Sequence, residues 1–81
     1  MGSKFKVLSG KDIVKILSSF GFSLHSHKGS HMKLKRLVSD NVETLIIPNH
    51  NPVSPGTLKA IFNQALKYIP RSELQEHFFI K

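Results

Sequence analysis

Apolar residues near the start of the chain recur at helical spacing. They are Ile13, Ile16, Leu17 and Phe20. Ser9 precedes this run, and Asp12 follows Ser9 at the three-residue distance of a capping box, which marks the first turn of a helix. Gly21 fits the left-handed residue that commonly ends a helix, with Phe22 placed to fold back on the last turn. The pattern therefore predicts a helix over residues 10–20.

From Phe22 onward the period of the pattern changes to two, which is typical of β-strands. Apolar and polar side chains alternate on both sides of a turn at Lys28-Gly29. One face is predicted to hold Phe22, Leu24, Met32 and Leu34. The other face is predicted to hold Ser23, His25, His27, His31, Lys33 and Lys35. Because the apolar face has to cover the helices, the open face of this hairpin carries three histidines and two lysines.

A third strand and a second helix follow the hairpin. Residues 42–47 form a β-branched, apolar stretch that ends at Pro48, which predicts a strand. Ser54 and Pro55 then provide an N-cap and a proline at the first helical position. The apolar stripe that follows consists of Leu58, Ile61, Phe62, Ala65, Leu66 and Ile69. This stripe predicts a helix from Pro55 that is halted by Pro70.

The order α-β-β-β-α predicts an α+β fold, in which a three-stranded antiparallel sheet carries both helices on one face and leaves the other face open. We assign residues 1–69 to one domain and residues 70–81 to a C-terminal tail, in which Ser72 can open a short third helix. The tail ends in the apolar residues Phe78, Phe79 and Ile80. These side chains need a cover, either the domain itself or a second chain.

Positive charge is concentrated in the middle of the chain. The 81 residues carry a net charge of +7. No acidic residue lies between Asp12 and Asp40. The basic residues of this stretch are Lys15, Lys28, Lys33, Lys35 and Arg36. Such a patch attracts polyanions or an acidic protein, although a basic surface that serves only solubility has the same composition.

Several classes of protein are disfavoured by what the sequence lacks. Without cysteine there is no disulfide, no thiolate metal site and no cysteine nucleophile. No apolar run approaches the length that spans a membrane, and the first residues lack the apolar region of a signal peptide. We therefore expect a cytoplasmic protein with no membrane contact.

His31 is the residue whose chemistry most needs an explanation. Cleavage of an RNA phosphodiester needs a proton removed from the ribose 2′-hydroxyl, a proton given to the leaving oxygen, and positive charge near the phosphorus. Histidine can take and return a proton near neutral pH, and Lys28, Lys33 and Lys35 can supply the charge. This set of groups requires neither a metal nor another cofactor.

Other roles for the histidines stay open at this point. His25, His27 and His31 resemble a three-histidine zinc set, but no carboxylate or cysteine completes it and the lysines repel a dication. The same residues can form an ordinary solvated strand face. His50, in the loop before the second helix, can bind a phosphate there or make a structural hydrogen bond.

Five short segments of the chain form a recognisable set. They are Ser9-Gly10-Lys11, Gly21-Phe22, Lys28-Gly29-Ser30-His31, Ile47-Pro48-Asn49-His50, and Ser54-Pro55-Gly56-Thr57-Leu58 continuing to Ile61, Gln64 and Ala65. Together these segments resemble the HicA toxins of bacterial and archaeal toxin-antitoxin systems, which are small mRNA interferases. They cover about residues 7 to 67 in the order and spacing of that family. Residues 70–81 extend beyond its usual end.

The resemblance implies a fold like a double-stranded-RNA-binding domain, metal-independent cleavage of mRNA, and inhibition by a HicB-type antitoxin that covers the active surface. The resemblance implies cleavage with a single histidine as general acid or base, and the position that matches this histidine is His31. His25 and His27 are the candidates for a second proton-transfer group. We predict that the RNA is contacted by Lys28, Ser30, Lys33, Lys35, His25 and His27. The alternatives are a non-catalytic RNA-binding module of the same architecture and an interaction domain whose basic face meets an acidic protein.

Overall fold

The computed structural model describes residues 4–80 and contains the predicted succession of helix, three strands and helix. In chain order, the elements are β1 (Lys4–Phe5), α1 (Gly10–Ser18), β2 (Ser23–Lys28), β3 (His31–Val38), β4 (Asn41–Pro48), α2 (Pro55–Ala65), α3 (Arg71–Phe78) and β5 (Phe79–Ile80). The predicted α+β class is confirmed, and α3 is the short helix expected in the tail. The predicted domain begins at residue 1 and the predicted tail ends at residue 81, and residues 1–3 and 81 lie outside the described residues. The expectation that no signal peptide is present concerns the same first residues. None of the helices in residues 4–80 is both long and apolar enough to cross a bilayer.

Both ends of α1 follow from the local sequence. The Ser9 hydroxyl accepts a hydrogen bond from the Asp12 backbone N–H, and the Asp12 carboxylate accepts one from the Ser9 N–H, each at 3.0 Å. At the other end Gly21 has a φ of 95°, and the Phe22 N–H reaches the Leu17 carbonyl at 3.2 Å. The capping box and the glycine stop are therefore both confirmed. The helix itself ends at Ser18, two residues before the predicted end, because residues 19–21 already belong to the turn.

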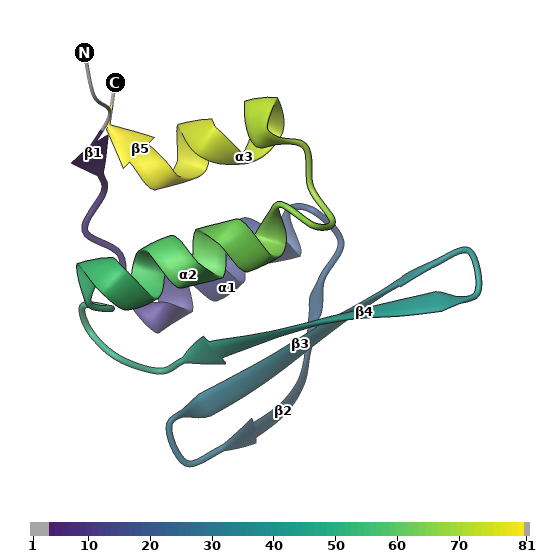
Figure 1. Ribbon diagram of the computed structural model, residues 1–81. Coiled ribbons are helices and arrows are strands. Elements are labelled where there is room, and N and C mark those ends of the chain that lie inside the picture. The colour runs from purple at the N-terminus through teal and green to yellow at the C-terminus, as the bar shows by residue number, and fades with distance from the viewer. Residues whose placement is uncertain (1–3, 81) are drawn as a thin grey trace.

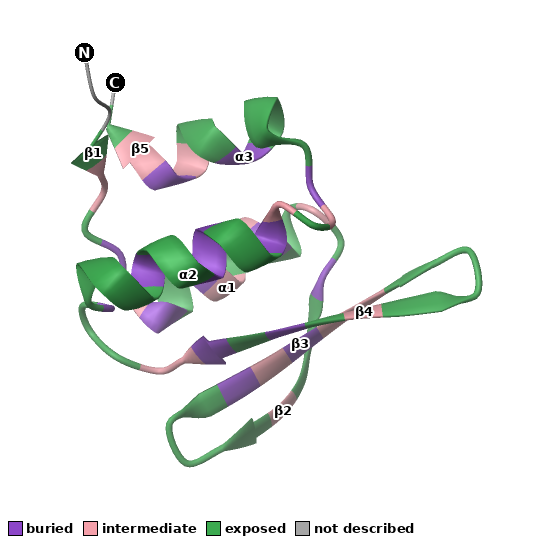
Figure 2. Cartoon of the chain, viewed as in Figure 1, coloured by how far each residue is buried: buried purple, intermediate pink, exposed green. Residues whose placement is uncertain are grey.

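The three longer strands form an antiparallel sheet in the order β2-β3-β4. Helices α1 and α2 lie on one side of it, with α3 on the far side of these two helices (Figure 1). The buried apolar residues lie on the sheet, on all three helices and on the segments that join them (Figure 2). They are Leu8, Ile13, Leu17, Phe22, Met32, Leu34, Leu45, Ile47, Val53, Leu58, Ile61, Phe62, Ala65, Ile69, Leu74 and Phe78. One core therefore serves the sheet and all three helices.

Arg36 joins the sheet to the carboxyl ends of α1 and α2. Its guanidinium donates to the carbonyl of Phe20 at 2.8 Å and to that of Tyr68 at 2.9 Å. It also pairs with Glu43 on β4, with Nε 2.7 Å from the carboxylate, and lies 4.8 Å from the centre of the Phe22 ring. Arg36 therefore sits on the helix side of the sheet, and counting it with the exposed basic patch was wrong. The alternation of β3 explains this, because Arg36 follows the buried Met32 and Leu34 at even spacing.

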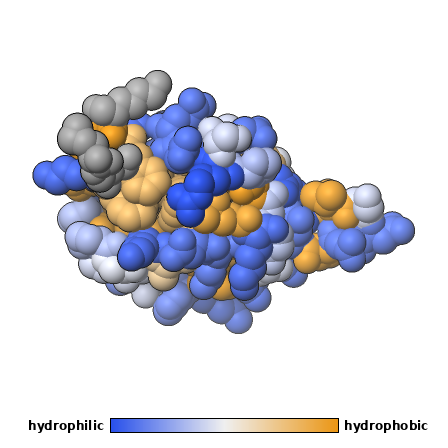
Figure 3. Space-filling view, turned by 45° about the horizontal axis from the view of Figure 1, so that its top comes forward, coloured by the Kyte–Doolittle hydropathy of each residue, from blue (hydrophilic) through white to orange (hydrophobic). Residues whose placement is uncertain are grey.

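The far end of the β3–β4 hairpin extends beyond the helices (Figure 1). Leu37, Val38 and Val42 are 72%, 42% and 60% exposed there. Apolar atoms are visible on this projecting part at the right of Figure 3. The hairpin end therefore contributes little to the core.

The C-terminal segment packs back on the body of the chain. Leu74 and Phe78 are fully buried, and β5 pairs with β1 so that Phe79 lies opposite Phe5. The Phe62 ring of α2 lies 5.3 Å from the Phe78 ring and 5.1 Å from the Phe79 ring. The apolar tail residues were predicted to pack against either the domain itself or a second chain. The structure shows that Phe78 packs against the domain, whereas Ile80 stays 53% exposed.

Candidate functional site

The sheet face turned away from α1 and α2, which we call the open face, carries His31. Side chains alternate along β3, and Met32 and Leu34 are buried on the helix side, so His31, Lys33 and Lys35 point to the open face. Directly opposed residues of antiparallel strands share a face. The open face therefore has three rows, which are Lys28, His31 and Pro48, then Ser26, Lys33 and Ile46, then Ser23, Lys35 and Thr44.

One of the predicted site histidines does not join His31 on this face. His27 lies opposite Met32, which places it on the helix side. His25 lies at a β-bulge between Leu24 and Ser26 and has no paired residue on β3. For His27, the prediction that it shares the face of His31 was therefore wrong. The bulge adds one residue to β2, which shifts the alternation of every residue after it by one position.

This shift also decides which residues of β2 lie on the open face. Ser26 and Lys28 occupy the open face, whereas His27 does not. Lys28 lies directly opposite His31, so a cation and an imidazole share one row. Because His27 faces the other way, the three histidines do not converge, and residues 4–80 contain no cluster of three His, Cys, Asp or Glu side chains placed to hold a metal ion.

The β4 contribution to the open face was missed at the sequence level. Thr44, Ile46 and Pro48 lie beside Lys35, Lys33 and His31. A usable signal exists, because Ser39 and Asp40 form a two-residue turn between the paired residues Val38 and Asn41. A turn of known length fixes the register of the strands that it joins.

The turn that holds His31 is tied to two other segments. The Asn49 N–H donates to the Ser30 carbonyl at 2.6 Å, and the Gly10 N–H donates to the His50 carbonyl at 2.8 Å. A Cβ at Gly10 would lie 2.1 Å from the Pro48 carbonyl oxygen, so only glycine allows this approach. The β2–β3 turn, the end of β4 and the start of α1 therefore meet at one end of the molecule (Figure 1).

The turn also requires a glycine for its backbone conformation. Gly29 has a φ of 55°, in the left-handed region, whereas the space around its Cα is open. The requirement is therefore conformational, because an L side chain at such a φ costs about 1 to 2 kcal/mol. Ser30, the next residue, is exposed and uses its carbonyl for the bond to Asn49.

The charge on the open face is positive. Lys28 and His31 are exposed, and Lys33 and Lys35 are half-buried. The nearest acid along β4, Glu43, faces the helix side and is paired with Arg36, and Asp40 lies at the hairpin tip. Within residues 4–80 the His31 ring takes part in no hydrogen bond or ion pair. Such a face presents an accessible imidazole among ammonium groups, which suits a phosphodiester substrate.

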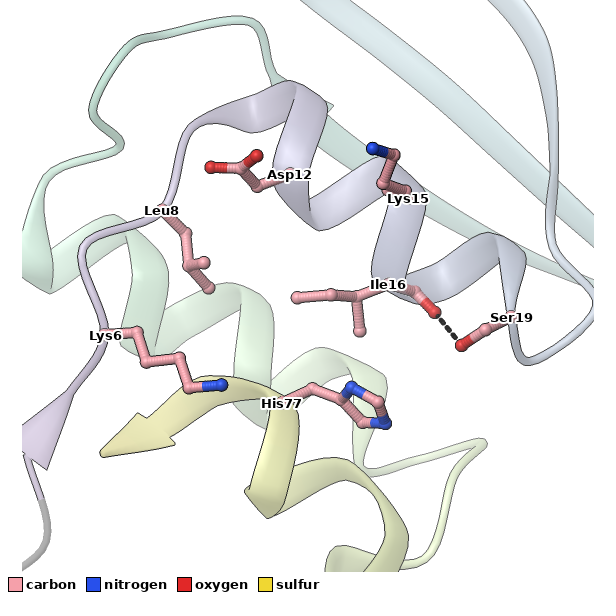
Figure 4. Close-up of a pocket in the computed structure, with 7 residues that line it drawn as sticks. All are labelled: Lys6, Leu8, Asp12, Lys15, Ile16, Ser19 and His77. Atoms are coloured by element: carbon pink, nitrogen blue, oxygen red, sulfur yellow. Dashed lines mark hydrogen bonds between the residues drawn. The ribbon is translucent and has the colours of Figure 1, made fainter. Parts of the chain in front are cut away.

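A second concave region lies on the opposite side of the molecule, between α1 and α3. It is an open hollow of about 510 Å³ that includes Lys6, Asp12, Lys15 and His77 (Figure 4). The Asp12 carboxylate lies among the lysines here, and its pKa is lowered first by the hydrogen bond from the Ser9 backbone N–H and then by that with the Ser9 side chain. Positive and negative groups are mixed in this hollow, so it lacks the uniform charge of the open face.

Comparison with known proteins adds one match. The family model described as "HicA toxin of bacterial toxin-antitoxin" matches residues 10–66. No curated protein and no solved structure gives a match. The matched range contains α1, the whole three-stranded sheet and α2, whereas β1, α3 and β5 lie outside it.

Proposed function

This chain belongs to the HicA toxin family, and from that membership we propose that it is a metal-independent endoribonuclease that cleaves mRNA, with His31 as general acid or base. Family membership makes the chain a toxin of a toxin-antitoxin system, and such toxins generally cleave RNA. The substrate class is therefore RNA and the protein partner is an antitoxin. We assign the system to type II and the antitoxin to the HicB type.

The observation that carries the proposal is the position of His31. Its side chain is exposed on the open face, directly opposite Lys28 and one row from Lys33. RNA can approach this face because no helix of residues 4–80 covers it (Figure 1). Lysines bind phosphates as point charges, so a bound backbone phosphate lies within the same rows as the imidazole.

The proposed reaction is an internal transesterification. The 2′-hydroxyl loses its proton and its oxygen attacks the adjacent phosphorus. The bond from phosphorus to the 5′-oxygen of the next nucleotide then breaks, and that oxygen takes up a proton. The products are a 2′,3′-cyclic phosphate and a 5′-hydroxyl, so no water, metal or other reactant is consumed. His31 transfers one of the two protons, and Lys28, Lys33 and Lys35 stabilise the charge on the phosphorane.

The decisive experiment compares the wild-type protein with His31→Ala on a labelled RNA in the presence of EDTA. We expect wild-type cleavage to survive chelation and the variant to lose about 10²- to 10⁴-fold in rate, the usual contribution of a proton-transfer group. His77→Ala is the matched control, because it removes a histidine of α3, which lies on the far side of α1 and α2 from the sheet (Figure 1). Thermal unfolding of both variants checks that each is folded.

Three results would contradict the proposal. Cleavage that EDTA abolishes would indicate a metal-dependent reaction. Cleavage by His31→Ala at the wild-type rate would remove His31 from the chemistry. Salt-sensitive RNA binding by the wild-type protein without any products would favour the non-catalytic RNA-binding module instead.

A further inference from the structure

His50 is the histidine whose neighbours along the chain contact the His31 turn. Pro48 lies directly opposite His31, which places their Cα atoms about 4.5 to 5.5 Å apart. Asn49 donates its N–H to Ser30 at 2.6 Å. His50 is the next residue, and it is exposed. Two exposed imidazoles are therefore carried by backbone segments that are hydrogen-bonded to each other.

The position of His50 is fixed although it lies in a loop. Its carbonyl accepts the Gly10 N–H at 2.8 Å, and the backbone of α1 approaches so closely at Gly10 that no side chain fits there. The loop is thus held by β3 on one side and by the start of α1 on the other. Because these bonds use the backbone of His50, they leave its ring available. No hydrogen bond or ion pair among residues 4–80 involves that ring.

The other histidines lack this combination. His27 faces the helix side of the sheet, and His25 lies at the bulge away from the turn. His77 belongs to α3, where its ring packs edge-on against Phe20 at 5.5 Å and lies 3.9 Å from the Glu76 carboxylate. Among the described residues, His50 is therefore the histidine that accompanies His31 at the same end of the sheet.

We infer that His31 and His50 divide the two proton transfers of RNA cleavage, an assignment that rests on the function proposed above. One ring takes the proton of the 2′-hydroxyl as the 2′-oxygen bonds to phosphorus. The other ring gives a proton to the 5′-oxygen as its bond to phosphorus breaks. The two rings exchange protonation states in the process, and proton exchange with water restores them for the next turnover.

The test uses two RNA substrates cut at one mapped position, one normal and one with sulfur in place of the leaving 5′-oxygen. A thiolate leaves without being protonated, because a thiol has a pKa of only about 8.5. We expect His50→Ala and His31→Ala each to lose about 10²- to 10⁴-fold in single-turnover rate on the normal RNA. The sulfur substrate should restore most of the loss in one of the two variants and not in the other, and the restored variant identifies the acid.

Two further variants separate catalysis from positioning. His50→Gln keeps hydrogen-bonding groups but transfers no proton near neutral pH, so it should be as slow as His50→Ala on the normal RNA. His77→Ala should match wild type on both substrates. His50→Ala keeps the backbone carbonyl that binds Gly10, and its thermal unfolding should match that of wild type.

The outcomes distinguish this inference from the proposed function. A wild-type protein that cleaves neither RNA, or a fully active His31→Ala, overturns the proposed function and the inference with it. A slow His31→Ala beside a fully active His50→Ala or His50→Gln overturns the inference alone. Rescue by sulfur in both variants, or in neither, also overturns it, because divided proton transfers require rescue in one.

Discussion

The guanidinium of Arg36 contacts β4, the end of α1 and the turn after α2 at the same time. Each of these contacts satisfies a group that folding removes from water, namely the Glu43 carboxylate and the carbonyls of Phe20 and Tyr68. The side chains of Arg36 and Glu43 are only 19% and 17% exposed. A partly buried ion pair of this kind is costly to break from one side, because the remaining charge keeps its desolvation cost without its partner.

We predict that Arg36→Ala lowers the free energy of unfolding by about 2 to 3 kcal/mol. Urea unfolding followed by circular dichroism measures the loss. Arg71→Ala is the control, since Arg71 is exposed and contacts the Phe62 ring at 5.3 Å, so its removal should cost less than about 1 kcal/mol. Equal midpoints for Arg36→Ala and wild type would show that Arg36 does not link sheet and helices in solution.

At the scale of the element, α1 begins with two reciprocal hydrogen bonds, and the Asp12 carboxylate accepts the one that the Ser9 backbone N–H donates. The pKa of Asp12 lies below its ordinary value of 3.8, chiefly because this carboxylate accepts the Ser9 backbone N–H. A pKa that folding lowers stabilises the folded state above the ordinary value, and the contribution disappears as the pH falls through the folded-state value. The start of α1 should therefore loosen in acid.

The corresponding prediction compares wild type with Asp12→Ala across pH. Wild type should gain stability over the variant as the pH rises to 3.8 and hold a constant advantage above it. The pH-dependent part of the difference isolates the carboxylate, because the higher helix propensity of alanine does not change with pH. Parallel stability curves for the two proteins would show that the ionised Asp12 carboxylate adds nothing to stability in solution.

Sequence patterns located the main helices and strands, but they did not predict which side chains of β2 point to which face of the sheet. The caps, the apolar stripes and the two turns located α1, α2 and the three main strands, because each depends on neighbouring residues alone. In β2, only Leu24 is apolar among residues 23–28. Such a strand has no strong preference for either face, so the alternation of apolar and polar residues alone did not reveal the bulge that turns His27 toward the helix side.

The pairing of β1 with β5 could not be predicted from local sequence patterns either. β1 and β5 have two residues each, too few to show a period of two, and they pair only because α3 returns the chain to its start. The position of His50 beside the His31 turn likewise depends on a contact between residues 30 and 49. Contacts of this range come from the packing of whole elements, and a single sequence read locally does not contain them.

At the scale of the whole molecule, the segment outside the family match completes the hydrophobic core. Phe78 is fully buried, and it packs against Phe62 of α2 within the matched range. A domain of 81 residues has an expected stability of only about 4 to 12 kcal/mol. The loss of one large buried side chain is therefore a considerable part of the total.

We predict that Phe78→Ala lowers the free energy of unfolding by about 3 to 5 kcal/mol, the usual cost of a large cavity. Thermal unfolding at several protein concentrations measures the effect and detects aggregation. Ile80→Ala, at a site that is 53% exposed, is the matched control and should change the stability little. A stable, monomeric Phe78→Ala would mean that the fold is complete without the packing of α3.

The pairing of β1 with β5 has a practical consequence for work with this protein. Lys4 and Ile80 face each other across that two-stranded ribbon, on the far side of the helical layer from the β2–β3 turn (Figure 1). A purification tag, a fluorophore or a surface linker fused ahead of Lys4 or behind Ile80 would emerge from the same corner. Either fusion would leave the end of the molecule that carries His31 and His50 unobstructed. Protein immobilised through either attachment point could therefore be titrated with RNA.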